Sequence, residues 1–226
     1  MQRVELLGIT REEIQTIFQE TLRNFKESKT RVIYLDASYL YNFHLDDFEH
    51  VKKFNLLGRY DIKAVREWHN CLERWFNDKT VTLGNNLVKP IQISRTFDKV
   101  VNEGMESLAR TITGSDADNY DFRAIGTGEG VALPSDRTLI TEINRIDVDS
   151  SPDGGSLSAD GSTIYSIGNH PKSVESASIT ECGMFNNTLE SGNDLMFDHS
   201  MFQTPVTHVQ NADAVGSTTV VYMCSA

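Results

Sequence analysis

Residues 139–185 have the sequence LITEINRIDVDSSPDGGSLSADGSTIYSIGNHPKSVESASITECGMF, and this stretch decides the predicted fold. Short runs in which apolar and polar residues alternate are separated by the turn sequences SSPDGG, SADGS and NHPK. Pro, Gly, Asn and Asp supply the backbone angles that tight turns need. Short strands that are separated in this way predict an antiparallel β-sandwich or barrel.

The same pattern extends outward from this stretch. Glycine rises from three residues in 1–96 to twelve in 97–226. We expect a β-sandwich domain over residues 97–226, which begins with a helix at 97–110, and both a jelly-roll and an immunoglobulin-like strand order stay open. The expected strands of this domain cover residues 120–125, 139–148, 163–168, 173–185, 195–202 and 217–224.

Before the sandwich, apolar residues recur at helical spacing. One helix is expected at residues 10–25, and a second one is capped by Asp61 and ends near Phe76. Short strands are expected at 31–35 and 89–95, the second of which leads into the sandwich. The predicted fold class is therefore α+β, with a mainly helical docking region over residues 1–96 followed by the antiparallel β-sandwich.

Charge is divided unevenly along the chain. Residues 1–96 carry 15 Lys+Arg and 13 Asp+Glu, whereas residues 97–226 carry 6 and 19, so the net charges are +2 and −13. An acidic domain repels phosphate, which argues against direct binding of nucleic acid. The acidic surface favours either solubility alone or contact with a basic neighbour in an assembly.

Membrane and redox features are sparse. No apolar run approaches the roughly 20 residues of a membrane span, and the first residues lack the apolar core of a signal peptide. Cys71, Cys182 and Cys224 are too few and too scattered for a disulfide framework or a zinc site. We expect buried thiols, with a bond between Cys182 and Cys224 as the alternative.

Motifs that would indicate an enzyme fail in detail. Gly126 and Gly128 follow a predicted strand, but a dinucleotide-binding loop needs a third glycine where Val131 stands, and then a helix. We expect these glycines to let the strand turn sharply instead. Asp147, Asp149 and Asp153 miss the spacing of a calcium loop, and the histidines lack metal-ligand spacing. The chain is predicted to be no enzyme and to hold no cofactor or metal.

Two predicted strands, TEINR and TECGMF, carry residues for which we expect structural roles. Alternation along the second strand places four of its residues on one face: Ile179, Glu181, Gly183 and Phe185. A carboxylate on an apolar face needs a partner, and Arg145 is the candidate for Glu181. Gly183 would leave room for a neighbouring ring. Alternation also predicts that Glu142 and Arg145 point to opposite faces of their strand.

Several segments, taken in order, carry a resemblance. They are VVNEGMESLARTITGS at 100–115, YDFRAIGTGEGVALPSDRTLITEINR at 120–145, SASITECGMFNN at 176–187, SGNDLMFDHSMFQTPVTH at 191–208 and the closing STTVVYMCSA. Together they resemble a group of virion proteins of tailed phages and prophages over about residues 100–226. The chain departs from the pattern of that group at Asn102 and Glu103, at Cys182, and at Asp198 and His199.

The resemblance implies a non-enzymatic structural component of a tailed-virus particle: a neck or collar, tail, baseplate or capsid-attached protein. Such a protein is made in the host cytoplasm and located in the virion. Its expected partners are other virion structural proteins and further copies of itself in three-, five-, six- or twelvefold rings. The alternative function is a module that binds a host receptor or a glycan. Residues 1–96 lie outside the resemblance.

Overall fold

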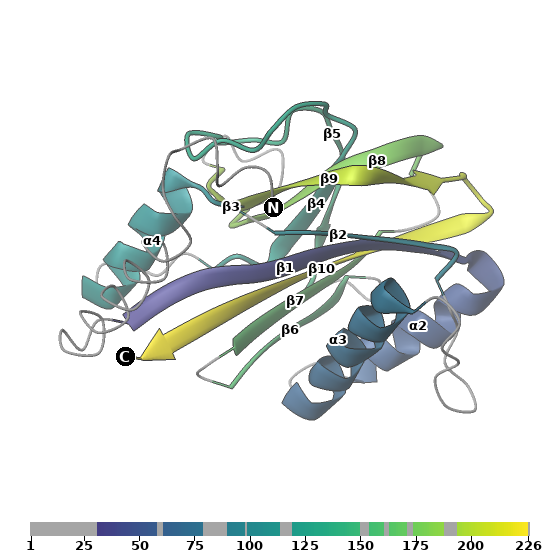
Figure 1. Cartoon of the computed structure of the whole chain (residues 1–226), viewed down its shortest axis with the longest axis horizontal. Coiled ribbons are helices and arrows are strands. Elements are labelled where there is room, and N and C mark those ends of the chain that lie inside the picture. Colours follow the sequence, from purple (N-terminus) through teal and green to yellow (C-terminus); the bar gives the residue numbers. More distant parts are fainter. Residues whose placement is uncertain are drawn as a thin grey trace, which may run out of the picture. The chain divides into compact units, whose positions relative to one another are not determined.

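Figure 1 shows the computed structural model of the chain. The structure describes residues 31–57, 61–78, 90–97, 99–113, 119–149, 154–160, 163–170, 174–187 and 194–225. Leu35–Tyr222 form one compact unit, and the few described residues beyond it are assigned to another. The core clusters lie within Leu35–Tyr222.

Two five-stranded sheets of mostly antiparallel strands make up most of this unit. Sheet A has the order β2 (Gln92–Thr96), β1 (Arg31–His44), β10 (Asp213–Ser225), β7 (Thr163–His170) and β6 (Gly155–Ala159). Sheet B has the order β3 (Lys99–Val100), β9 (Met196–His208), β8 (Ala177–Phe185), β4 (Phe122–Gly126) and β5 (Glu142–Asp147). The predicted antiparallel β-architecture is therefore confirmed at this level.

The two sheets share a core cluster, in a β-sandwich-like arrangement. Leu40 of β1 and Val215 of β10 come from sheet A, and Ile125, Ile179 and Cys182 are among the residues from sheet B. Their burial follows the alternation of strand residues, since every second side chain points to the same face. This cluster joins the two sheets.

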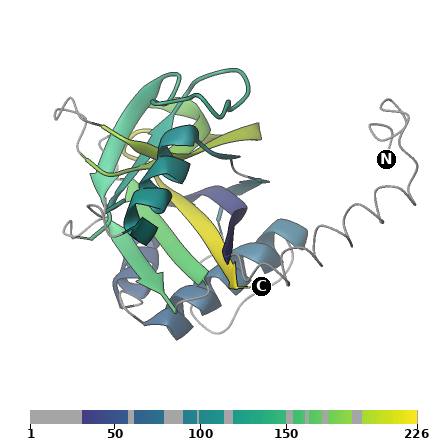
Figure 2. The same ribbon diagram turned by 90° about the vertical axis from the view of Figure 1, so that its left-hand side faces the viewer.

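The other face of sheet A is covered by the helices α2 (Leu45–Leu57) and α3 (Ile62–Asn77). Both views show these two helices next to one another and apart from α4 (Asn102–Thr113) (Figures 1 and 2). Asp61 caps α3 by accepting a hydrogen bond from the Lys63 amide at 3.0 Å, which confirms the predicted helix and its cap. Apolar side chains at spacings of three and four then face the sheet: Val65, Trp68, Leu72 and Trp75.

A third cluster lies on the other face of sheet B. It contains Val101, Ala124, Leu139, Phe185 and Met196. Helix α4 contacts β9, and its first amide, at Asn102, donates to the Pro134 carbonyl at 2.7 Å. A helix and the irregular stretch between β4 and β5 thus share the covering of this sheet.

Several expected boundaries need correction. The proposed division near residue 96 does not separate the sandwich from what precedes it, because β1 and β2 both belong to sheet A. The strand expected at 31–35 extends to His44, and β6 was missed. The helix expected at 97–110 begins only at Asn102, because Lys99–Val100 pair with β9. The helix expected at 10–25 lies outside the described residues.

Candidate functional site

Residues 127–141, here called the β4–β5 segment, connect β4 to β5 without a helix or strand. The Thr127 amide donates to the Thr141 carbonyl at 2.9 Å, which closes the base of the segment. Three backbone amides near its ends donate to the buried carboxylate of Glu181: those of Gly128 at 2.9 Å, Ile140 at 2.9 Å and Thr141 at 2.8 Å. Both ends of the segment are therefore tied to β8.

The middle of the segment is tied to sheet B through His199 of β9. His199 Nε2 lies 2.9 Å from Glu181 Oε2, and Nδ1 lies 2.6 Å from Asp136 Oδ2. Asp136 also accepts a hydrogen bond from the Leu133 amide at 2.7 Å, so it orders the turn in which it lies. The side chains of Glu181 and His199 have no exposed surface. We call Asp136, Glu181 and His199 the carboxylate–histidine cluster.

The protonation states of His199 and Glu181 decide how strongly the side chains of the carboxylate–histidine cluster bind one another. Burial alone would lower the pKa of His199, but hydrogen bonds with Glu181 and Asp136 and their charges raise it above its ordinary value of 6.5. Burial alone would raise the pKa of Glu181, but its bonds from His199 and from three backbone amides lower it. An imidazolium that donates both N–H groups to two carboxylates satisfies all three side chains.

Gly126 and Gly128 border the Glu181 carboxylate. A Cβ atom at either position would lie 2.5 Å from Glu181 Oε1. Neither glycine is among those described with a positive φ, which are Gly130 and Gly155. The sharp turn predicted for these glycines therefore does not rest on a positive φ. These glycines are needed because the carboxylate approaches the backbone so closely.

Arg145 belongs to a separate cluster, so the expected Arg145–Glu181 pair is wrong. Its guanidinium donates to Glu142 through Nε at 2.8 Å and Nη2 at 2.7 Å, and Nη1 lies 2.7 Å from Asp194 Oδ2. The guanidinium also lies over the Phe185 ring, 3.6 Å from its centroid. With its side chain 4% exposed, Arg145 joins β5 to the residues around β8.

A bulge explains why Glu142 and Arg145 meet. Arg145 pairs with Ala124 and Asn144 with Ile125, but Glu142 pairs with Gly126, so Ile143 is an extra residue in β5. One extra residue reverses the alternation of faces. Glu142 and Arg145 therefore lie on the same side, contrary to the expectation from strict alternation.

A second irregularity changes the predicted face of β8. Ile179 lies with Cys182 in the cluster between the sheets, whereas Phe185 lies in the cluster on the other face of sheet B. The prediction that Ile179 and Phe185 share one face of β8 is therefore wrong. The pairing of β8 with β9 shifts between Ile179 and Glu181, which interrupts the regular alternation. A Cβ atom at Gly183 would lie 3.3 Å from the Phe185 ring and 2.7 Å from the Asp198 carbonyl oxygen.

Arg123, which the sequence pattern did not single out, forms another buried network. Its Nη1 donates to Thr219 Oγ1 at 2.6 Å and lies 4.0 Å from Asp198 Oδ1, while Nη2 donates to Cys182 Sγ at 3.2 Å. Cys182 is a buried thiol, and the side chain of Cys224 lies outside the description. The position of Arg123 within the otherwise apolar run FRAIG was the sequence signal for this buried network.

The chemistry open to these groups is limited by their contacts. Both ring nitrogens of His199 are engaged by carboxylates and buried, so the ring has no nitrogen left for a substrate. Within the described ranges, no group of three His, Cys, Asp or Glu side chains is placed to hold a metal ion. The clusters can fix backbone and side chains in place.

What the cluster fixes is an apolar surface. Val131 is 70% exposed, Leu133 48% and Ile140 50%, and all three lie in the β4–β5 segment. The sequence gives no signal for these three side chains as a surface, because isolated apolar residues between turn residues form no periodic pattern. Large exposed side chains on a fixed backbone are typical of a binding surface.

Comparison of the chain with protein-family models, with curated proteins and with solved structures finds no match. In the part of the chain that the structure describes, every helix is too short or too polar to cross a membrane.

Proposed function

We propose that this chain is a non-enzymatic structural component of a tailed-virus particle, which acts through contacts between subunits. A neck or collar, tail, baseplate or capsid-attached position fits the resemblance over residues 100–226. The observation that carries the proposal is the β4–β5 segment, which presents Val131, Leu133 and Ile140 to solvent on a backbone tied to Glu181.

Such a segment suits a lasting contact with another subunit. Exposed apolar side chains gain free energy when a partner removes them from water. A backbone already fixed loses little conformational entropy on binding, so more of that gain appears as affinity. Hydrogen bonds to a buried carboxylate and histidine provide this preorganisation.

The charged groups argue for a structural role rather than catalysis. Glu181, His199 and Arg145 are each engaged by several partners within the chain. A general acid or base must reach a substrate proton, which a buried and fully engaged group does not.

The partners follow from charge and symmetry. The net charge of −13 over residues 97–226 favours a basic surface on a neighbouring virion protein. Copies of the chain would form three-, five-, six- or twelvefold rings in the virion, after synthesis in the host cytoplasm. Residues 1–96 would contribute β1, β2 and the covering helices to the same body, with further docking contacts.

A matched pair of variants tests the proposal. Val131→Ser combined with Leu133→Ser removes two exposed apolar groups from the β4–β5 segment, while Val209→Ser removes one that is 46% exposed elsewhere. We expect both proteins to keep the wild-type melting temperature. The double variant should be lost from purified particles, and the Val209→Ser protein should be incorporated normally. Incorporation of the double variant at the wild-type level would overturn the proposal.

Receptor or glycan binding is the second candidate function. The turns SSPDGG and SADGS lie partly outside the described residues and contain no aromatic residue. A groove along β2, which combines aromatic rings with polar side chains, favours this candidate.

A further inference from the structure

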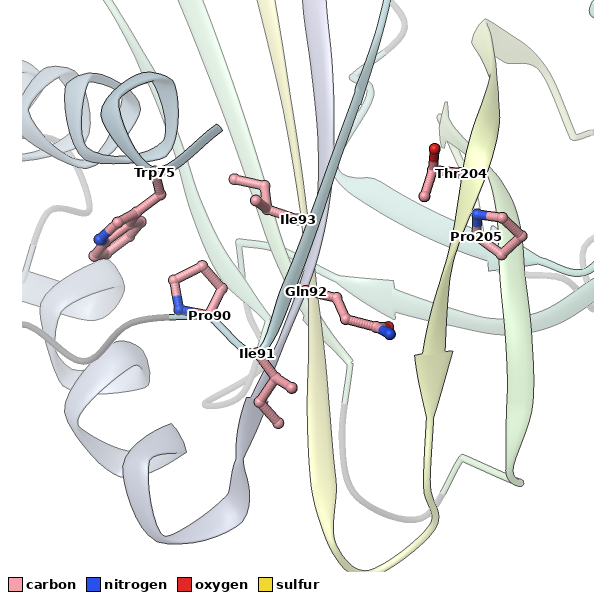
Figure 3. A pocket seen from close by; sticks show the side chains of 7 residues that line it. All are labelled: Trp75, Pro90, Ile91, Gln92, Ile93, Thr204 and Pro205. Carbon is pink, nitrogen blue, oxygen red and sulfur yellow. The ribbon is translucent and has the colours of Figure 1, made fainter. Parts of the chain in front are cut away.

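Two hollows lie along β2, which stands at one end of the strand order of sheet A. One has a volume of about 310 Å³ and the other about 550 Å³, and Ile93 and Thr204 line both. In Figure 3, Trp75 and Pro90 lie on one side of β2, and Thr204 and Pro205 lie on the other. Every residue from 90 to 97 lines one hollow or both. We call this surface the β2 groove.

The far wall of the groove comes from an irregularity in β9. Glu181 pairs with Met201 and Ile179 with Val206, so residues 202–205 of β9 lie opposite a single residue of β8. Three of these extra residues, at 203–205, are exposed and face the groove. The Thr207 amide donates to Gln92 Oε1 at 2.7 Å, which fixes this wall against β2.

The larger hollow combines ring faces with polar groups. Phe76 and Phe97 supply the rings, and Phe97 is 73% exposed. The Arg95 guanidinium lies 4.4 Å from the Phe76 centroid and 5.7 Å from the Phe97 centroid, so it restrains both rings. Hydroxyl, amide and guanidinium groups complete the lining: Ser94, Arg95, Thr96, Gln203 and Thr204.

This combination suits a sugar ring. The C–H face of a sugar packs on an aromatic ring, while its hydroxyl groups both donate and accept hydrogen bonds at its rim. Ligand sites commonly pair apolar surface with a few placed polar groups in this way. A volume of about 550 Å³ lies within the usual range for such sites.

Charge favours a neutral sugar over an acidic one. The Arg95 guanidinium is already paired with Glu73, with Nη1 3.2 Å from both carboxylate oxygens. The net charge of the whole chain, −11, would repel an anionic saccharide. Of the described residues that line the hollows, none is Asp or Glu. Because glycoside hydrolysis uses a pair of carboxylates, the groove would bind a sugar without cleaving it.

An extended peptide fits the groove less well. A peptide that pairs with an edge strand needs an open row of backbone groups and pockets for alternate side chains. Here β9 contacts β2, and the Thr207 amide of β9 donates to the Gln92 side chain of β2. The Asn42 side chain of β1 also donates to the Thr207 carbonyl. Five of the eight residues that line the larger hollow are polar, which leaves few apolar pockets for the alternate side chains of a peptide.

We propose that the β2 groove binds a neutral saccharide chain, which stacks on Phe97 and bonds to Gln203 and Thr204. This site differs from the β4–β5 segment and does not depend on the chain's role in a particle. It gives the second candidate function a place and a ligand class.

The test begins with the purified full chain on an array that holds neutral glycans and glycans with sialic or uronic acids. The neutral glycan retained most strongly is then titrated against Phe97→Ala, Gln203→Ala, Phe97→Tyr and Met105→Ala. Phe97→Tyr keeps the ring, and Met105 is an exposed apolar residue of α4. We expect neutral glycans to be retained, Phe97→Ala and Gln203→Ala each to lose at least tenfold in affinity, and the two control variants to bind as the wild type does.

Several results would overturn the proposal. These are retention of no glycan, retention of acidic glycans alone, or unchanged binding by Phe97→Ala. Capture of extended peptides in a parallel peptide array, with no glycan retained, would assign the groove to a peptide instead. Incorporation into particles is measured separately. Failure of the glycan experiment therefore leaves the structural proposal intact, and failure of the incorporation experiment leaves the proposed glycan site intact.

Discussion

The outer faces of the two sheets are covered in different ways. On sheet A, rings of α3 and β1 pack edge to face: Trp68 lies 5.7 Å from Trp75 and 5.6 Å from Tyr41, measured between centroids. On sheet B, the β4–β5 segment is held by hydrogen bonds to Glu181 and His199. Ring packing is apolar and uncharged, whereas the bonds to the cluster are directional and depend on protonation.

This difference indicates a division of roles. The cover of sheet A buries its apolar side chains and contributes mainly to stability. The cover of sheet B uses buried charged groups to hold exposed apolar side chains in place. Burying these charges costs stability, and such a cost is expected where a partner binds. Variants in the cover of each sheet separate these two roles.

Removing a ring from the cover of sheet A should have the largest effect. Trp68 is fully buried, so Trp68→Ala should destabilise the protein by about 3–5 kcal/mol through lost burial and a cavity. Denaturant unfolding measures this loss, which should be the same at pH 6 and pH 9. A loss below about 1 kcal/mol would show that the rings do not stabilise this face.

Removing the charge of Glu181 should have the next largest effect, and a more local one. Glu181→Gln weakens four hydrogen bonds and leaves His199 without its buried counter-charge, at a cost of about 2–3 kcal/mol. Amide exchange should speed up at Gly128, Ile140 and Thr141 before global unfolding, and not in α3. Unchanged exchange rates at these three amides would show that their hydrogen bonds to Glu181 do not hold the β4–β5 segment in place.

The cluster should also make the cover of sheet B depend on pH. Because the folded pKa of His199 is raised, its contribution is complete below the ordinary value of 6.5 and is lost as pH rises through the folded pKa. Because the pKa of Glu181 is lowered, its contribution is present above 4.5 and is lost as pH falls through the folded pKa. The stabilisation that Glu181 and His199 provide together should therefore be greatest at pH values between the folded pKa of Glu181 and that of His199.

The difference between wild type and His199→Asn isolates this effect. Buried His170, whose pKa is lowered to about 3, reduces stability below pH 6.5 in both proteins and cancels in the difference. The charged groups that lie around His199 are Asp136, Glu181 and the buried Asp198. The free-energy difference should shrink as pH is raised above neutral, and a flat difference would show that His199 is uncharged in the fold.

The smallest effect is expected at Arg145. Arg145→Lys keeps the charge but loses the fork that reaches both Glu142 and Asp194, at a cost of about 1 kcal/mol. For a chain of this size the melting temperature should fall by about 2–4 °C. A fall in melting temperature as large as that of Trp68→Ala would mean that Arg145 stabilises all of sheet B and not only the contact between β5 and β8.

Local patterns predicted α3 well, but they missed α2, β6 and most of β1. The Asp61 cap and the apolar spacing from Val65 to Trp75 predict α3, because a helix signals itself within one stretch of chain. β1 was mostly missed because Leu40 faces the sheet interface while Tyr39 and Tyr41 face the helices. A strand buried on both faces has no alternation to detect.

The site was harder to predict, because its parts lie far apart in the sequence. His199 meets Asp136 across 63 positions and Glu181 across 18. The bulge that places Glu142 beside Arg145 reverses an alternation that the sequence alone suggests is regular. Cys182, Asp198 and His199, where the chain departs from the resembled virion pattern, all belong to the buried networks. Those departures were the signal available in the sequence.

A cryo-EM reconstruction of an intact particle tests the central proposal most directly. It should show this chain in symmetric copies, with Val131, Leu133 and Ile140 buried against a neighbouring subunit. Absence of the chain from purified particles, or a β4–β5 segment that faces solvent in every copy, would contradict the proposed function.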